Sequence, residues 1–146
     1  MSIVYLVDNS ALQRVRTSPR VEAAVLALLE TGELGSCLPQ LLEQGYSARA
    51  KAEHRLIVWD NLEGKVFLPP EAPVASLAIE LQSKLFAAGQ GRAVGVSDLQ
   101  IAATALHHTT SARTVVIVHY DSDFEALRAV EPRLRTQWIV PKGTEP

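Results

Sequence analysis

Short runs that are apolar on both faces alternate along this chain with longer stretches whose apolar residues recur at helical spacing. Uninterrupted runs of this kind are typical of strands buried in a parallel sheet, and the longer stretches predict helices. The expected strands are residues 3–7, 34–38, 66–68, 114–119 and 137–140. Because strands and helices alternate throughout, we predict an α/β fold with a central, mainly parallel sheet of four to five strands flanked by helices.

Two helix starts between these strands are marked by proline. Ser18 followed by Pro19 is a typical helix start, with an N-cap residue before a proline at the first helical position. A second helix is expected to begin at Pro39 and to continue to Gly64, with a break near residues 53–54. Both helices follow a predicted strand, as the alternating pattern requires.

Residues 97–106 predict a buried helix that opens with an acid. Ser97 as the N-cap and Gln100 three residues later match a capping box. Asp98 would then occupy the first helical position, where free backbone N–H groups and the helix dipole favour a carboxylate. The rest of the stretch is almost wholly apolar, so we expect it to be buried. Asp98 is therefore either a helix-start acid or a residue of a functional site.

Length and composition limit the broad classes of protein to which this chain can belong. The 146 residues are expected to form one domain, 1–146, with a polar C-terminal tail at 142–146. Cys37 is the single cysteine, which excludes an internal disulfide and fits a reducing compartment. No membrane segment or secretory signal is recognisable, so we expect a cytoplasmic protein. The net charge of −2 decides nothing about a polyanionic partner.

Acidic residues follow several of the predicted strands. Each has an ordinary structural explanation alone, as a turn, cap or solvated helix residue, but parallel strands bring their carboxyl ends to one edge of the sheet. Two carboxylates about 4 Å apart repel by roughly 4 kcal/mol at an effective dielectric near 20, so such a cluster takes up protons or binds a cation. Oxygen ligands favour Mg²⁺ or Mn²⁺, which suits phosphodiester hydrolysis. The acids are Asp8, Glu43, Asp98, Asp121 and Asp123.

Other chemistries find less support. The chain has no glycine-rich phosphate loop and no nucleophile elbow. His107 and His108 are adjacent on a predicted helix and should point about 100° apart, which is poor for sharing one metal ion. Ser10 could hold a phosphate or Asp8 through its hydroxyl group, or cap a helix.

The set of motifs resembles the PIN-domain ribonucleases, and more closely the VapC-type toxins of bacterial toxin–antitoxin pairs. The matching segments come in the family's order and are 3–10, 39–43 with Arg49, 98–105, 120–124 and 138–141. The resemblance implies a PIN-like (Rossmann-like) three-layer fold and Mg²⁺- or Mn²⁺-dependent endonucleolytic cleavage of RNA. It further implies a homodimer, or a larger hetero-oligomer, inhibited by a cognate VapB-like antitoxin. Whether the RNA is tRNA, rRNA or mRNA stays open.

The family's roles carry over to particular residues. Asp8, Glu43, Asp98 and Asp121 would be the catalytic and metal-binding acids, with Asp123 as an additional or alternate ligand and Asn9 and Ser10 in support. The chain departs from the common pattern at His119, where many relatives have Thr or Ser, and at Gln100, where an aliphatic residue is common.

Two alternatives remain. One is a catalytically silent PIN scaffold that binds RNA or protein. The other is a receiver-like phosphoacceptor domain, which needs an aspartate at the end of its central strand, whereas Val66–Leu68 runs into two prolines.

Overall fold

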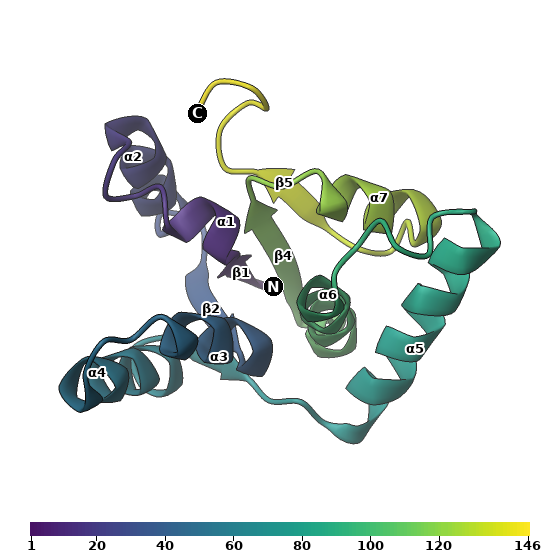
Figure 1. Cartoon of the computed structure of the whole chain (residues 1–146), viewed down its shortest axis with the longest axis horizontal. Coiled ribbons are helices and arrows are strands. Elements are labelled where there is room, and N and C mark those ends of the chain that lie inside the picture. Colours follow the sequence, from purple (N-terminus) through teal and green to yellow (C-terminus); the bar gives the residue numbers. More distant parts are fainter.

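The computed structural model describes residues 1–146 and contains five strands in one parallel sheet (Figure 1). The strands are β1 (Ser2–Val7), β2 (Glu33–Cys37), β3 (Val66–Leu68), β4 (Arg113–His119) and β5 (Thr136–Trp138). Their order across the sheet is β3-β2-β1-β4-β5, and every neighbouring pair is parallel. The predicted α/β class and mainly parallel sheet are confirmed.

Seven helices cover the two faces of this sheet and complete the three layers. They are α1 (Asn9–Leu12), α2 (Pro19–Leu28), α3 (Leu38–Tyr46), α4 (Lys51–Leu62), α5 (Ala72–Ala87), α6 (Val96–His108) and α7 (Asp123–Val130). Alternate residues of β1 enter different cores: Leu6 belongs to an 18-residue core with α5, α6 and α7, whereas Val7 belongs to a nine-residue core with α1 and α2. Both faces of β1 are therefore buried, which explains its uninterrupted apolar sequence.

Two predicted features of the first helices have different outcomes. The Ser18 cap is confirmed, because its side chain accepts a hydrogen bond from the Val21 N–H group at 3.2 Å. The predicted break in the helical stretch is confirmed, but it lies at residues 47–50 and not near 53–54, since α3 ends at Tyr46 and α4 begins at Lys51. The Glu53 carboxylate accepts a hydrogen bond from the Arg49 N–H group at 3.1 Å, so it marks the start of α4 rather than a break.

The predicted capping box at Ser97 is also wrong. Helix α6 begins at Val96, its N-cap is the extended residue Gly95, and no side chain caps it. The Gln100 side chain donates instead to the Val96 carbonyl at 3.3 Å. Asp98 is therefore the third helical residue and not the first. The predicted burial is confirmed, because most of residues 99–105 belong to the core.

The polar C-terminal segment lies against the end of β4. The Tyr120 hydroxyl donates to the Glu145 carbonyl at 3.1 Å and accepts from the Glu145 N–H group at 2.8 Å. The Arg14 guanidinium lies 4.5 Å from the centre of the Tyr120 ring. Residues 142–146 are thus polar but folded back onto the first and last parts of the chain.

Two further observations concern the core and the helices. Cys37 is fully buried, and burial raises the pKa of its thiol to about 12, so it is a core residue. None of the helices combines the length and the apolar character needed to cross a membrane.

Candidate active site

The centre of the candidate site lies where the order of strands reverses, between β1 and β4. These strands pair directly, and open parallel sheets bind ligands beyond the carboxyl ends of strands at such a point. Asp8 follows β1 and is 5% exposed. Its carboxylate accepts a hydrogen bond from the Ser10 N–H group at 3.1 Å and so caps α1. Burial raises the pKa of Asp8, while hydrogen bonds from Ser10 lower it.

The turn after β4 places two more acids beside this strand end. The Asp121 N–H group donates to His119 Nδ1 at 3.2 Å, and the Asp123 N–H group donates to Asp121 Oδ1 at 2.9 Å. The His119 ring is buried between Phe124 and Trp138, with ring centres 5.0 and 4.9 Å away. Burial lowers the pKa of His119 to about 4. At neutral pH this ring is therefore an uncharged acceptor that orients the turn.

Helix α6 delivers Asp98 to the same place. A short loop joins the end of α6 to β4. The first turn of α6 lies at the far end of β4, where the Asp98 carboxylate is close to that of Asp121. One carboxylate oxygen from each of Asp98, Asp121 and Asp123 lies within 4.8 Å of the others. Burial, followed by the negative charges of Asp8 and Asp121, raises the pKa of Asp98 to about 8. Burial and Asp121 also raise the pKa of Asp123.

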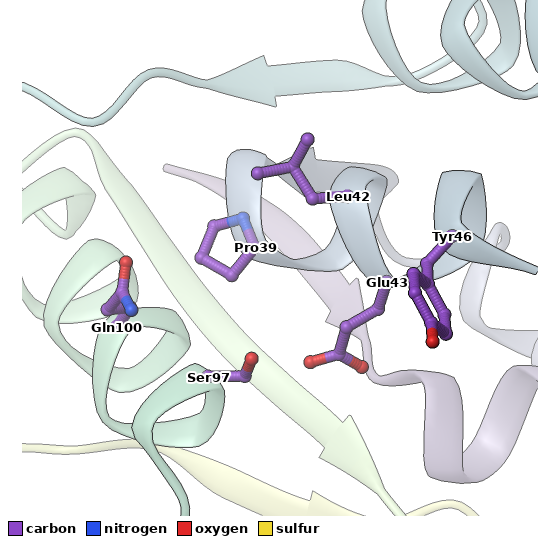
Figure 2. Close-up of a pocket in the computed structure, with 6 residues that line it drawn as sticks. All are labelled: Pro39, Leu42, Glu43, Tyr46, Ser97 and Gln100. Atoms are coloured by element: carbon purple, nitrogen blue, oxygen red, sulfur yellow. The ribbon is translucent and has the colours of Figure 1, made fainter.

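Glu43 flanks this group from α3. The Asn9 side chain donates to Glu43 Oε2 at 3.1 Å, and the Asn9 Oδ1 atom accepts from Gln44 at 2.9 Å. The carboxylate extends from α3 toward the Ser97 side of α6 (Figure 2). It borders a pocket of about 340 Å³, which is lined by Pro39, Leu42, Glu43, Tyr46, Ser97 and Gln100. Glu43 and Asp8 therefore stand beside the three-acid group rather than within it.

Other polar residues hold these elements together. The Ser10 hydroxyl accepts from the Tyr120 N–H group at 2.9 Å, which ties α1 to the end of β4. Gln40, 1% exposed, donates its side-chain amide to the Val7 carbonyl, and sequence reasoning missed this contact between α3 and β1. No sequence pattern signals it, because the contact depends on how α3 packs against β1.

A divalent cation fits this set of residues. Every candidate ligand atom is a carboxylate oxygen, which suits a hard ion. None of the five acids takes part in any of the chain's ion pairs with Lys, Arg or His. Their mutual repulsion is therefore relieved only by protons or by a bound cation.

Comparison with known proteins identifies the family. The family profile described as the PIN domain matches residues 5–130. The chain is 35% identical over 144 residues to Ribonuclease VapC21 of Mycobacterium tuberculosis, covering 99% of both chains. It is 37% identical over 145 residues to Ribonuclease VapC51 of the same organism, covering 99% of this chain and 98% of that protein. The chain belongs to the VapC ribonucleases of the PIN-domain family. The resemblance seen in the sequence motifs is thereby confirmed.

Solved VapBC structures share the VapC fold described above. The VapBC2 complex of Rickettsia felis, bound to a promoter DNA fragment, matches with a TM-score of 0.70 at 15% identity, over 92% of this chain and 98% of that one. The DNA-bound VapBC of Salmonella typhimurium matches with a TM-score of 0.68 at 19% identity, over 96% of this chain and all of that one. Because the sequence identities of these two matches are low, they show similarity of fold alone.

Proposed function

We propose that this VapC-family chain is an endoribonuclease that uses Mg²⁺ or Mn²⁺ and acts as the toxin of a toxin–antitoxin pair. The observation that carries the proposal is the group of carboxylates at the β1/β4 switch point, which no cationic side chain neutralises. Family membership supports ribonuclease activity, and the hard-oxygen ligand set supports the choice of metal. We further propose that residues 1–146 act as one PIN-like domain.

The proposed metal ligands are Asp8, Asp98 and Asp121, with Asp123 as an additional or alternate ligand. Asp121 is preferred to Asp123 because its backbone is anchored by His119 and its carboxylate is fixed by the Asp123 N–H group. When bound, the metal orients the scissile phosphate, lowers the pKa of the attacking water and stabilises the leaving oxygen. Ser10 and His119 hold Asp8 and Asp121 in place through hydrogen bonds, and Asn9 holds Glu43.

Glu43 is proposed to take the proton of the attacking water. Its Oε2 atom is held by Asn9, which leaves Oε1 free for a water molecule in the pocket between α3 and α6. Attack by water breaks the bond to the 3′ oxygen or to the 5′ oxygen of the phosphodiester. Cleavage of the 3′ oxygen bond leaves a 3′-hydroxyl group and a 5′-phosphate. We propose this cleavage, so the 5′-phosphate end of the downstream fragment is the product to detect.

The proposed partners are RNA, a VapB-like antitoxin and a second copy of the chain. Support comes from the VapBC complexes among the related folds. Exposed apolar side chains on α3 and α4, including those of Tyr46, Leu56 and Trp59, support a protein partner, because such residues are costly to leave in water. A short reading frame directly upstream that encodes a small basic protein would supply the antitoxin.

Neither alternative is favoured by a specific observation. A receiver-like domain has the strand order 2-1-3-4-5, in which the third strand of the chain is central and carries the acceptor aspartate, but here β3 is an edge strand that ends at Leu68. A silent scaffold gives no reason for several acids to remain together without a cation.

Induced expression in bacterial cells tests the proposal. The wild type is compared with Asp98→Asn and with a matched control, Asp60→Asn. Asp60 is the one aspartate outside the site and pairs with Lys65 at 3.2 Å on the surface. We expect the wild type and the control to arrest growth and to create the same new 5′-phosphate ends in cellular RNA. Asp98→Asn should neither arrest growth nor create these ends. The proposal would be contradicted if cells that express Asp98→Asn contained the same new RNA ends, or if cells that express the wild type contained none. Sequencing these ends also identifies the RNA.

A further inference from the structure

A second group of metal-ligand residues lies at the opposite end of α6 from Asp98. His107 and His108 close this helix, and Glu71 is the N-cap residue of α5. His107 Nε2 lies 3.0 Å from Glu71 Oε1, and His108 Nε2 lies 3.7 Å from the same oxygen. One ligand atom from each of the three residues lies within 4.8 Å of the others.

The expected divergence of the adjacent histidines does not keep their ligand atoms apart, since one atom from each lies within 4.8 Å of the other and of a Glu71 oxygen. Their ring centres are 4.9 Å apart, with the ring planes at 72°. The helix itself sets the diverging directions of the two side chains. Glu71 enters between their tips from the β3–α5 connection, which adjacency along the helix could not reveal.

The distances and the ligand types suit a zinc-like ion. Zn²⁺ bonds of about 2.0–2.1 Å to nitrogen place two ligand atoms of a tetrahedron about 3.3 Å apart, between the two measured spacings. Imidazole nitrogens with one carboxylate oxygen favour Zn²⁺ or Co²⁺ over Mg²⁺, unlike the all-oxygen group at the other end of α6. Two histidines and one glutamate leave a fourth position open for water.

The surroundings also favour a cation. The site lies at the C-terminal end of a 13-residue helix, where unpaired carbonyls carry the negative end of the helix dipole. Glu71 has no ion pair with a lysine or an arginine that would compete for it. His108 is 7% exposed and is held by packing, whereas Glu71 is half exposed and leaves a path for the ion.

One existing contact would change on binding. His108 Nε2 is hydrogen-bonded to the Pro69 carbonyl at 2.9 Å. Coordination through this nitrogen requires it to be unprotonated, so the bond to Pro69 is exchanged for the bond to the metal. The Pro69 carbonyl also accepts a hydrogen bond from the Glu71 N–H group at 2.9 Å, so it keeps one donor when His108 turns to the metal.

We propose that Glu71, His107 and His108 form a second divalent metal site, of the Zn²⁺ class, that ties the start of α5 to the end of α6. The site is separate from the acids around Asp98, because it lies at the other end of the same helix. Its effect is structural: it fixes the β3–α5 connection against α6.

Titration of the untagged protein with Co²⁺, in excess Mg²⁺, tests this site. The visible absorption of Co²⁺ reports nitrogen coordination, and displacement by Zn²⁺ gives the relative affinity. The variants are Glu71→Gln and His107→Gln, whose side chains are partly exposed, with Asp98→Asn as the control at the acidic group. Circular dichroism verifies that each variant is folded.

We expect one Co²⁺ per chain with an imidazole-type spectrum, and affinity reduced by at least about tenfold in both site variants but unchanged in Asp98→Asn. The proposal is overturned if both site variants bind Co²⁺ as tightly as the wild type, which would leave a Glu–His ion pair without metal. It is equally overturned if Asp98→Asn alone removes the spectrum.

Discussion

Replacing Asp98 by asparagine should stabilise the metal-free protein while removing its activity. The carboxylate is half-buried beside Asp8 and Asp121, so its charged form is unfavourable in the folded state. Asparagine keeps the size of the side chain but carries no charge, and its NH₂ group replaces one acceptor oxygen by a donor. The substitution therefore removes the repulsion between the Asp98 carboxylate and its acidic neighbours. In the wild type this repulsion destabilises the metal-free protein and favours binding of a cation.

The structure gives the magnitude of this effect. The pKa of Asp98 rises from 3.8 to about 8 on folding. At about 1.4 kcal/mol per pKa unit, this rise corresponds to an upper bound of roughly 6 kcal/mol. Water around the half-buried carboxylate screens part of the repulsion, so we expect about 2–4 kcal/mol above pH 8.

The sign follows from proton linkage. Because the folded-state pKa is raised, the Asp98 contribution is most favourable below pH 3.8, decreases as pH rises, and levels off above about pH 8. The advantage of Asp98→Asn should therefore grow across this interval. Other groups contribute similarly to both proteins, so the difference between them isolates Asp98.

Urea unfolding in EDTA at several pH values measures this difference. Saturating Mg²⁺ should then stabilise the wild type more than the variant, because the cation replaces the protons. A variant that is less stable than the wild type at pH 8 in EDTA would refute the reasoning. It would show that Asp98 mainly serves to stabilise the start of α6.

Three other predictions concern neighbouring residues. Ser97→Ala should change the free energy of unfolding by less than about 0.5 kcal/mol, because Ser97 caps nothing, whereas Ser18→Ala should cost about 0.5–2 kcal/mol; equal losses in urea unfolding would contradict this. His119 should titrate near pH 4 in an NMR titration and not near 6.5. Its lowered pKa contributes on the order of 3 kcal/mol to the free energy of unfolding above pH 6.5, and this contribution is lost as the pH falls toward 4. Asp121→Asn should reduce RNA cleavage at least about tenfold more than Asp123→Asn, and the reverse order would reassign the ligand.

The approach of the acids to one another could be predicted from the sequence, because parallel strands bring the residues that follow them to the same edge of the sheet. Residues directly after β1 and β4 must lie at one edge once those strands pair side by side. The same reasoning placed Asp98. A helix that precedes a parallel strand runs back along the sheet, so its first residues lie near the C-terminal end of that strand. Strand patterns with both faces buried are strong signals, so these parts of the fold could be predicted.

Local patterns with several solutions could not be resolved in this way. Ser97 and Gln100 match a capping box, yet the extended backbone of Gly95 lets α6 begin earlier, and the box does not form. The contact of Glu71 with the two histidines depends on tertiary packing between α5 and α6, which no spacing within one helix encodes. The Gln40 contact with β1 is hidden for the same reason.

Cleavage of purified RNA by the wild type, Asp98→Asn and Asp60→Asn tests the carboxylate centre most directly. Each protein is assayed with Mg²⁺, with Mn²⁺ and with EDTA, after circular dichroism shows that it is folded. We expect the wild type and Asp60→Asn to cleave RNA equally and only with a divalent cation, and Asp98→Asn to be at least about a hundredfold slower. Cleavage by the wild type in EDTA, or equal rates for Asp98→Asn and the wild type, would contradict a metal-dependent mechanism at these acids.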